Sequence, residues 1–400
     1  MAIFQNRKKT EEKKLGIYVH IPFCKSRCEY CSFYSKGGSM DPKTVDRYMQ
    51  ALADHMKEAG KGAKDHVVDT IYFGGGTPSY FGASNLDHIL DEIHRNFNVS
   101  TNPEITVEVN PDSVDEKSLK QLLRAGFNRL SMGVQCHDDG ILARIGRPHT
   151  FRQAKEAMEL ARKVGFANIS LDLMYGLPGQ DFELWMKSVE EIVAMRPEHI
   201  SCYCLSIEEN CAMYGYRNQL SIANEDQQLR MYLAASQYLR ENGYEHYEVS
   251  NYGKKGMESR HNKKYWNCEE YLGFGPSASS YFGGKRFKIV ENIKGYIEGI
   301  AKQGQVLEEC ETISPRERSG EYLMLQARLK EGISPTEYEK RFLQSFEPME
   351  IFLASCVDEG YTEYKNGRWS LTEKGWFISN HIIVKLMDAQ ENSRPLPGKF

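Results

Sequence analysis

The chain has 400 residues, of which 40% are hydrophobic, enough to bury a large core and to exclude a disordered protein. Its formal net charge is -4, with 51 Lys and Arg against 55 Asp and Glu, which gives no reason to expect a nucleic-acid partner. No apolar run approaches the roughly 20 residues of a membrane-spanning helix, and the charged start lacks the apolar segment of a secretory signal. The sequence therefore predicts a cytoplasmic protein with a barrel and an appendage, or with two or three domains.

Short β-rich runs alternate with longer amphipathic stretches from Gly16 to about Glu208, a pattern typical of βα units around a parallel sheet. Six strands are expected, at 16–21, 67–73, 104–109, 129–134, 169–174 and 199–206. Apolar residues at three- and four-residue spacing predict the intervening helices at 44–59, 86–97, 116–125, 152–164 and 183–195. Right-handed connections in this order curl the strands into a partial, open (β/α)6 TIM-like barrel.

The pattern changes after Glu208. A long helix is expected at 225–241, followed by two aromatic-rich segments at 244–252 and 261–281. The last part of the chain is predicted to be mainly helical, except for a β-hairpin with the turn Asn366-Gly367. This hairpin and a helix expected at 372–387 suit a small wing-like α/β domain.

These patterns divide the chain into three parts. Residues 1–15 are expected to form a flexible tail, because Glu residues interrupt its lysines; a weak contact with a membrane surface is the alternative. Residues 16–305 are expected to form the partial barrel with an extension that covers its ligand site. Residues 306–400 are expected to form the smaller, mainly helical C-terminal domain.

Unusual residues follow five of the expected strands. The first strand is followed by Cys24 to Cys31, and the others by Gly74-Gly75-Gly76-Thr77-Pro78, Asn110-Pro111, Gln135 and Tyr175 to Gly179. Active sites of α/β barrels are built at the carboxyl ends of the strands. Five strands therefore point to one common pocket.

Three cysteines, Cys24, Cys28 and Cys31, lie within eight residues of one another. Three thiolates on a 4Fe-4S cubane leave one iron free for the amino and carboxylate groups of a methionine moiety. The alternative is a zinc site, which needs a fourth Cys or His ligand and usually shows paired C-x2-C spacing. The glycine-rich loop after the next strand favours the cluster, since its bare backbone can approach a zwitterionic ligand.

The C-x3-C-x2-C and GGGTP loops together resemble those of the radical SAM superfamily, whose members use a 4Fe-4S cluster and S-adenosylmethionine. Residues 16–24 are similar to the YxHIPFC segment of the anaerobic coproporphyrinogen III dehydrogenases and their relatives, and the resemblance covers nearly the whole chain. It implies a radical SAM partial barrel with a HemN-like C-terminal domain. It also implies that one or two S-adenosylmethionine sites are lined by Tyr18, Tyr30, Gly75, Gly76, Thr77, Glu108, Gln135, Arg147 and Asp172.

Two features separate the branches of this family. The dehydrogenases typically carry another Cys two positions after the third cluster ligand, where this chain has Phe33. The segment His261 to Trp266 reproduces the HNxxYW motif of the HemW-type heme chaperones, whose His is implicated in heme binding. An imidazole can be an axial iron ligand, although a hydrogen-bonded structural histidine is the alternative. Two positions depart from the branch: Ser259 replaces a common Cys, which removes a second heme contact, and Gln326-Ala327-Arg328 replaces Gly-Leu-Arg.

The resemblance therefore implies a heme chaperone that binds heme, a 4Fe-4S cluster and S-adenosylmethionine. The acceptors that it implies are apo-cytochromes or other respiratory hemoproteins. The alternative is a radical enzyme, either a porphyrinogen decarboxylase, which Phe33 disfavours, or a methyltransferase, in which the HNxxYW motif is not expected. Whether the chain turns over a substrate, forms a homodimer or touches a membrane surface stays open at this stage.

Overall fold

A computed structural model of the protein describes residues 12–302 and 306–396, so most of the tail expected at 1–15 lies outside the described residues. Within them, twelve strands form one curved sheet in the order β14-β13-β12-β11-β1-β4-β5-β6-β7-β8-β10-β9. Its centre consists of six parallel strands, β1 (Lys13–Ile21), β4 (His66–Gly75), β5 (Val99–Val109), β6 (Arg129–Gln135), β7 (Ile169–Tyr175) and β8 (His199–Cys204). These are the six strands expected from the sequence, and β1 begins at Lys13, inside the expected tail.

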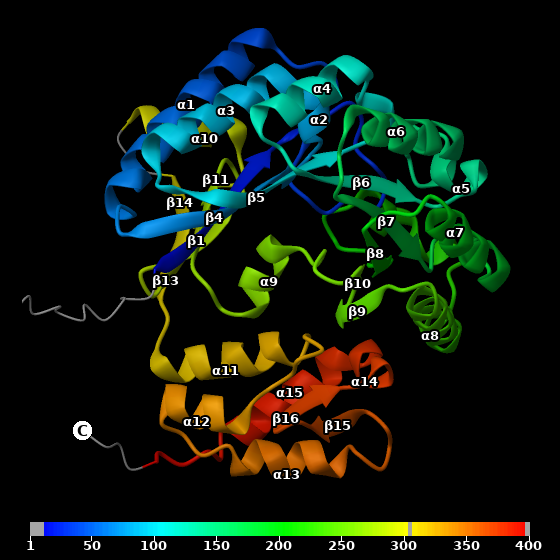
Figure 1. Ribbon diagram of the computed structural model, residues 1–400, viewed down its shortest axis with the longest axis vertical. Coiled ribbons are helices and arrows are strands. Elements are labelled where there is room, and N and C mark those ends of the chain that lie inside the picture. The colour runs from blue at the N-terminus through cyan, green and yellow to red at the C-terminus, as the bar shows by residue number, and fades with distance from the viewer. Residues whose placement is uncertain (1–11, 303–305, 397–400) are drawn as a thin grey trace, which may run out of the picture.

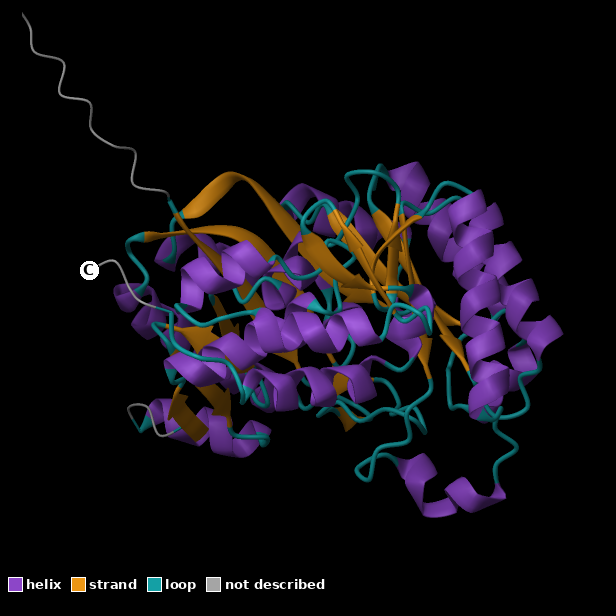
Figure 2. Ribbon diagram, turned by 90° about the horizontal axis from the view of Figure 1, so that it is seen from below, coloured by secondary structure: helices purple, strands orange, loops and turns teal. Residues whose placement is uncertain are grey.

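Helices cover the outer face of this sheet, which arches as a partial barrel (Figure 1). They are α1 (Pro42–Gly62), α2 (Pro78–Phe81), α3 (Ala83–Asn96), α4 (Glu116–Ala125), α5 (Asp139–Arg144), α6 (Phe151–Val164), α7 (Phe182–Ala194), α8 (Glu225–Glu241) and α10 (Ile293–Ala301), with short 3-10 turns at Pro111–Ser113 and Ala212–Gln219. Figure 2 shows the strands grouped inside this layer of helices. Capping boxes begin three of the helices, at Asp115, Thr150 and Asn224, because each side chain satisfies a free backbone N–H. In the part of the chain that the structure describes, no helix is both long and apolar enough to cross a membrane.

The aromatic-rich segments, together with residues that follow the second one, supply both ends of the sheet. Next to β8 lie the antiparallel strands β10 (Asn251–Gly253) and β9 (Glu245–Glu248). Next to β1 lies the parallel strand β11 (Tyr271–Phe274), followed by the antiparallel β12 (Ser279–Phe282), β13 (Lys285–Ile289) and β14 (Leu307–Thr312). The sequence does not predict these short strands. Because β14 pairs with β13, the division expected between residues 305 and 306 cuts through the large sheet.

The C-terminal domain packs around a second apolar core that includes Tyr322, Trp369 and Trp376. It consists of α11 (Pro315–Gln326), α12 (Pro335–Phe342), α13 (Glu347–Ser355), α14 (Glu373–Phe377), α15 (Ser379–Gln390) and the hairpin β15 (Thr362–Lys365) and β16 (Arg368–Leu371). The hairpin expected around Asn366-Gly367 is confirmed, and both residues have the positive φ of a two-residue turn, 52° and 76°. The single helix expected at 372–387 is wrong, because Ile378 leaves the helical conformation and divides it into α14 and α15.

The barrel and the C-terminal domain meet along β9 through backbone hydrogen bonds. The Val249 N–H donates to the carbonyl oxygen of Arg328, and the Lys330 N–H donates to that of Tyr247, both at 3.0 Å. In this seam the Glu248 side chain is fully buried, and neither carboxylate oxygen has a hydrogen-bond partner among the described residues. Burial raises the pKa of Glu248 to about 7, although Asn251 and Arg328 lie close enough to offset part of the effect.

We predict that Glu248→Gln stabilises the protein at neutral and alkaline pH. The carboxyl pKa is about 7 in the folded chain and about 4.3 in the unfolded chain. The folded state thus binds more protons in this window, and its stability falls as the pH rises through it. The variant lacks this loss, which amounts to at most about 4 kcal/mol at about 1.4 kcal/mol per pKa unit.

Urea denaturation at a series of pH values measures this difference. The free energy of unfolding of Glu248→Gln is expected to exceed that of the wild type increasingly between about pH 4.3 and 7 and by a constant amount above. The exposed Glu359, changed to Gln, is the matched control and is expected to follow the wild type. A difference for Glu248→Gln that does not change with pH contradicts the assignment.

Candidate cluster and cofactor site

The cysteine loop lies at the carboxyl end of β1, where the active sites of α/β barrels are built. The short strand β2 (Phe23–Cys24) pairs with β3 (Lys36–Gly37) and closes the loop at its base. Within the loop, the Cys31 N–H donates to the carbonyl oxygen of Cys28 at 3.2 Å. The loop is therefore compact and keeps its cysteines close to the end of the sheet.

The glycine-rich loop after β4 is bonded to the base of the cysteine loop. The N–H groups of Gly76 and Thr77 donate to the carbonyl oxygens of Ile21 and Phe23, both at 2.8 Å. The Thr77 hydroxyl also donates to the Sγ atom of Cys24 at 3.4 Å. A Cβ atom on Gly76 would lie 2.8 Å from both carbonyl oxygens, so the approach requires glycine. Two loops that follow different strands are thus fixed together.

The cysteines open into a cavity of about 640 Å³ at the carboxyl ends of the parallel strands. All site residues predicted from the sequence lie on its wall: Cys24, Cys28, Cys31, Tyr18, Tyr30, Gly75, Gly76, Thr77, Glu108, Gln135, Arg147, Asp172 and His261. Gln135 ends β6 with a positive φ of 70°, a conformation that costs on the order of 1–3 kcal/mol and is found mostly at functional sites. The fold thus brings residues from across the barrel to one place.

Arg147 supplies a positive charge beside the cysteines. Its Nη1 lies 3.6 Å from the Sγ atom of Cys28, and its Nη2 donates to Oδ1 of Asn110 at 2.8 Å. Its buried Nε has no partner among the residues that the structure describes. A guanidinium fixed in this way stabilises thiolates and can bind a carboxylate.

Two half-buried carboxyl groups lie at the strand ends that line the same cavity. Glu108 accepts hydrogen bonds from the Tyr72 hydroxyl at 2.9 Å and from the Gly75 N–H at 3.2 Å. Asp172 accepts from the hydroxyls of Ser131 and Ser170 at 3.3 and 3.4 Å. Burial raises the pKa of Glu108 to about 7 and the pKa of Asp172 above its ordinary value. A bound ammonium or other cationic group would favour the ionised form of both carboxyl groups, which then accept hydrogen bonds from it.

The three cysteines can serve as ligands of an iron-sulfur cluster. All three are free thiols on one cavity wall, and Cys thiolates are the ligands that hold a 4Fe-4S cubane. The adjacent glycine loop presents backbone groups to a zwitterionic ligand.

Helix α9 (Arg260–Trp266) lies at the open side of the arch, between the sheet and α11 (Figure 1). The Ser259 side chain caps it by accepting from the Asn262 N–H at 3.3 Å. The Glu104 carboxylate on β5 accepts from the N–H groups of Arg260 and His261 at 3.0 and 2.9 Å. The first turn of α9 is thereby anchored to the interior of the barrel.

The His261 side chain is held on all sides and is 1% exposed. Its Nδ1 lies 2.9 Å from the Thr70 hydroxyl, its Nε2 lies 2.8 Å from the Tyr265 hydroxyl, and its ring stacks on Tyr72. Burial, together with the charges of Lys264 and Arg129, lowers the pKa of His261 to about 3. The imidazole is therefore neutral at physiological pH, and iron can reach Nε2 only if Tyr265 moves.

Several residues on the cavity wall are not predicted from the sequence. They include Tyr72 on β4, Ser131 on β6, Tyr203 on β8 and Tyr265 on α9. On each strand, the inward side chains alternate with apolar side chains that face the outer helices. A polar residue at every second position of an otherwise apolar strand is the signal that could have identified Tyr72 and Ser131.

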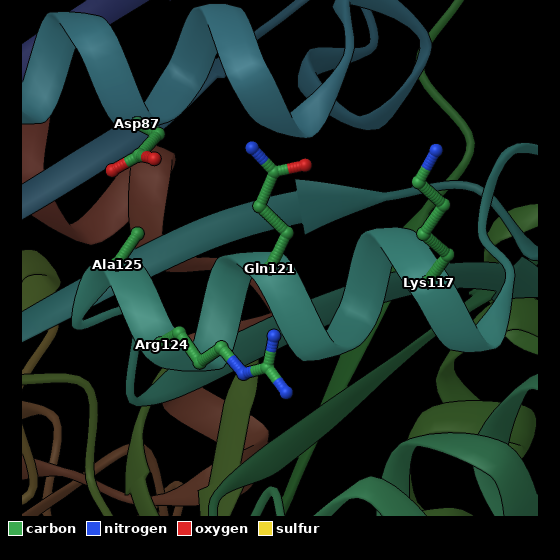
Figure 3. A pocket seen from close by; sticks show the side chains of 5 residues that line it. All are labelled: Asp87, Lys117, Gln121, Arg124 and Ala125. Atoms are coloured by element: carbon green, nitrogen blue, oxygen red, sulfur yellow. The ribbon is translucent and has the colours of Figure 1, made fainter.

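A smaller hollow of about 340 Å³ lies on the outer surface between α3 and α4 (Figure 3). Its wall consists of Asp87 on α3 and of Lys117, Gln121, Arg124 and Ala125 on α4. These side chains belong to two helices on the outer face of the sheet. The candidate site is therefore the larger cavity.

Comparison with known sequences agrees with this geometry. Residues 18–192 match the radical SAM superfamily. A heme chaperone HemW from Lactococcus lactis is 33% identical over 379 residues, covering 94% of this chain and 98% of the relative. The proteins of the same name from Bacillus subtilis and Escherichia coli are 34% and 30% identical, each covering 92% of this chain and 97% of the relative.

A solved structure has the same fold over almost the whole chain. It is described as the coproporphyrinogen III oxidase HemN from Escherichia coli, a radical SAM enzyme, and matches with a TM-score of 0.82 and 21% identity over 95% of this chain and 91% of that one. The expected fold, a radical SAM partial barrel with a smaller C-terminal domain, is confirmed. Membership of the superfamily implies a 4Fe-4S cluster and S-adenosylmethionine as cofactors. From the extent and identity of these matches, the chain belongs to the HemW family of the radical SAM superfamily.

Proposed function

We propose that this chain is a heme chaperone, which binds heme beside a 4Fe-4S cluster and S-adenosylmethionine and delivers it to apo-cytochromes or other respiratory hemoproteins. The proposal is supported by the similarity to HemW heme chaperones over more than nine-tenths of the chain. The observation that carries it is that His261 of the HNxxYW motif and the three cysteines line one cavity. Heme bound at α9 is then adjacent to the cluster.

In this proposal, Cys24, Cys28 and Cys31 hold the cluster by three of its irons. The cluster and S-adenosylmethionine, when bound, supply one-electron chemistry at the fourth iron. Arg147 offsets the negative charge beside Cys28. The expected S-adenosylmethionine contacts are the backbone of the glycine loop and the side chains Tyr18, Tyr30, Thr77, Glu108, Gln135, Arg147 and Asp172.

The heme site that we propose lies on the α9 side of the cavity, with His261 as part of it. Tyr18, Tyr72, Tyr203 and Tyr265 all line the cavity, and aromatic rings pack well against a porphyrin face. Phe33 is 64% exposed at the end of the cysteine loop and also borders the cavity. An apolar side chain at this position offers contact to a porphyrin but no proton to a reacting substrate.

We predict that Cys24→Ala prevents assembly of the cluster. Two thiolates cannot hold the cubane as three do, so bound iron and sulfide are expected to fall from about four of each per chain to well below half of this. The measurement is chemical analysis of iron and sulfide after anaerobic reconstitution. The matched control is Cys310→Ala, which changes an exposed cysteine on β14 and is expected to leave both contents unchanged. Equal iron and sulfide in Cys24→Ala and wild type would falsify the assignment.

We also predict that the reconstituted protein binds heme but does not convert coproporphyrinogen III. A heme titration is expected to saturate near one heme per chain. An anaerobic assay with S-adenosylmethionine and a reductant is expected to release no carbon dioxide from coproporphyrinogen III. The loaded protein is expected to transfer heme to an apo-cytochrome, whose absorbance reports the transfer. Carbon dioxide release without heme transfer would instead establish the rival function, a radical enzyme that acts on a porphyrinogen.

A further inference from the structure

The contact between His261 and Tyr265 bears on which atom binds the heme iron. A neutral imidazole offers one lone pair, and both ring nitrogens of His261 are already paired, with Thr70 and with Tyr265. The side chain is almost fully buried, its ring stacks on Tyr72, and its backbone N–H is bound by Glu104. Direct iron binding at Nε2 would therefore require the loss of a 2.8 Å hydrogen bond and a movement of the Tyr265 side chain.

Tyr265, in contrast to His261, offers an atom that a ligand in the cavity can bind. It is half-buried and borders the cavity, and in the described part of the chain the only hydrogen-bond partner of its hydroxyl is Nε2 of His261. Its ring is fixed edge-on between His261 and Tyr271, with centroid distances of 5.1 and 4.6 Å. The hydroxyl oxygen thus keeps a lone pair for a ligand, in an orientation set by two neighbours.

We propose that the phenolate oxygen of Tyr265 is the protein ligand of ferric heme iron, and that His261 is a positioning residue behind it. This inference rests on the proposed heme-binding function and names the iron ligand within that site. Phenolate is an established heme ligand in proteins. As a hard anionic donor it favours ferric over ferrous iron.

Tyr265 loses its hydroxyl proton when the oxygen–iron bond forms, and the proton leaves to solvent, so no electron is transferred. His261, whose side chain is 1% exposed, remains neutral. Its Nε2–H then donates to the phenolate oxygen, and its Nδ1 accepts from the Thr70 hydroxyl, which lies 2.9 Å away. The phenolate charge offsets the single net positive charge of the ferric porphyrin core.

The test uses the full chain with its reconstituted cluster and ferric heme as the probe. Resonance Raman spectra are expected to show phenolate vibrations of an iron-bound tyrosine. Tyr265→Phe is expected to lose these bands and to weaken ferric heme binding by more than the roughly 10- to 100-fold that loss of an outer partner costs. Tyr271→Phe is the matched control, since it makes the same change on the neighbouring ring, and is expected to keep both bands and affinity.

Variants of His261 test whether this residue binds the iron itself or positions Tyr265. His261→Ala is expected to weaken ferric heme binding about 10- to 100-fold and to shift the phenolate bands while retaining them. His261→Gln, whose amide can donate to the phenolate, is expected to restore part of the affinity. Reduction of the iron is expected to weaken binding in the wild type and to have little effect in Tyr265→Phe.

The outcomes distinguish this inference from the proposed function. Wild-type protein that binds ferric heme without phenolate bands, or a Tyr265→Phe variant that binds as the wild type does, overturns the ligand assignment and leaves heme binding intact. Loss of all binding in His261→Ala with full binding in Tyr265→Phe makes the imidazole the ligand. Wild-type protein that binds no heme overturns the proposed function and this inference together.

Discussion

The candidate site depends on the backbone hydrogen bonds that join the glycine loop to the base of the cysteine loop. They run from Gly76 and Thr77 to the carbonyl groups on either side of Pro22, and they exist because β1 and β4 are adjacent parallel strands that end at the same edge of the sheet. A side chain at position 76 would meet both carbonyl oxygens. The positions of the thiols are therefore set by the register of two strands rather than by the cysteine loop alone.

The same sheet leaves an opening that α9 and the C-terminal domain cover. The two end strands of the sheet, β9 and β14, do not pair with each other. Helix α9 lies at the open side of the arch, between the sheet and α11 (Figure 1). Gln326 of α11 donates to the carbonyl oxygen of Trp266 at the end of α9, and Arg328 lies over the Trp266 ring. The first turn of α9 is bound to the barrel and its last turn to the C-terminal domain. These contacts hold the helix that carries His261 and Tyr265 in place. The C-terminal domain therefore has a structural role at the cavity.

The sequence predicts the parallel sheet and the common location of the site well, for physical reasons. Fully buried strands and amphipathic helices have strong periodic signals, and α4 and α8 have the predicted bounds. The short strands β9 to β13 have three to five residues each, too few for a clear alternation, so they depend on neighbours distant in sequence. The single helix expected at 372–387 is wrong, because the chain leaves the helical conformation at Ile378. The division expected between residues 305 and 306 stays a prediction, and the pairing of β14 with β13 across it depends on contacts that sequence periodicity does not show. The contact between Tyr265 and His261 shows the same limit. The sequence shows that the two residues are four positions apart on a helix, but not that His261 is enclosed while Tyr265 borders the cavity.

The charged groups on the cavity wall favour a ligand that carries both cationic groups and a carboxylate. Arg147 lies beside the thiols, whereas Glu108 and Asp172 have raised pKa values, and the charge of Asp172 itself contributes to the shift of Glu108. Two carboxyl groups that share a partly buried wall are costly to ionise together unless a cation lies between them. A ligand that carries both an ammonium and a sulfonium group supplies that cation, and its carboxylate suits the guanidinium on the cysteine side. This asymmetry of charge suits S-adenosylmethionine between the cluster and the strand-end acids, and in the proposed function the porphyrin takes the aromatic side of the cavity at α9.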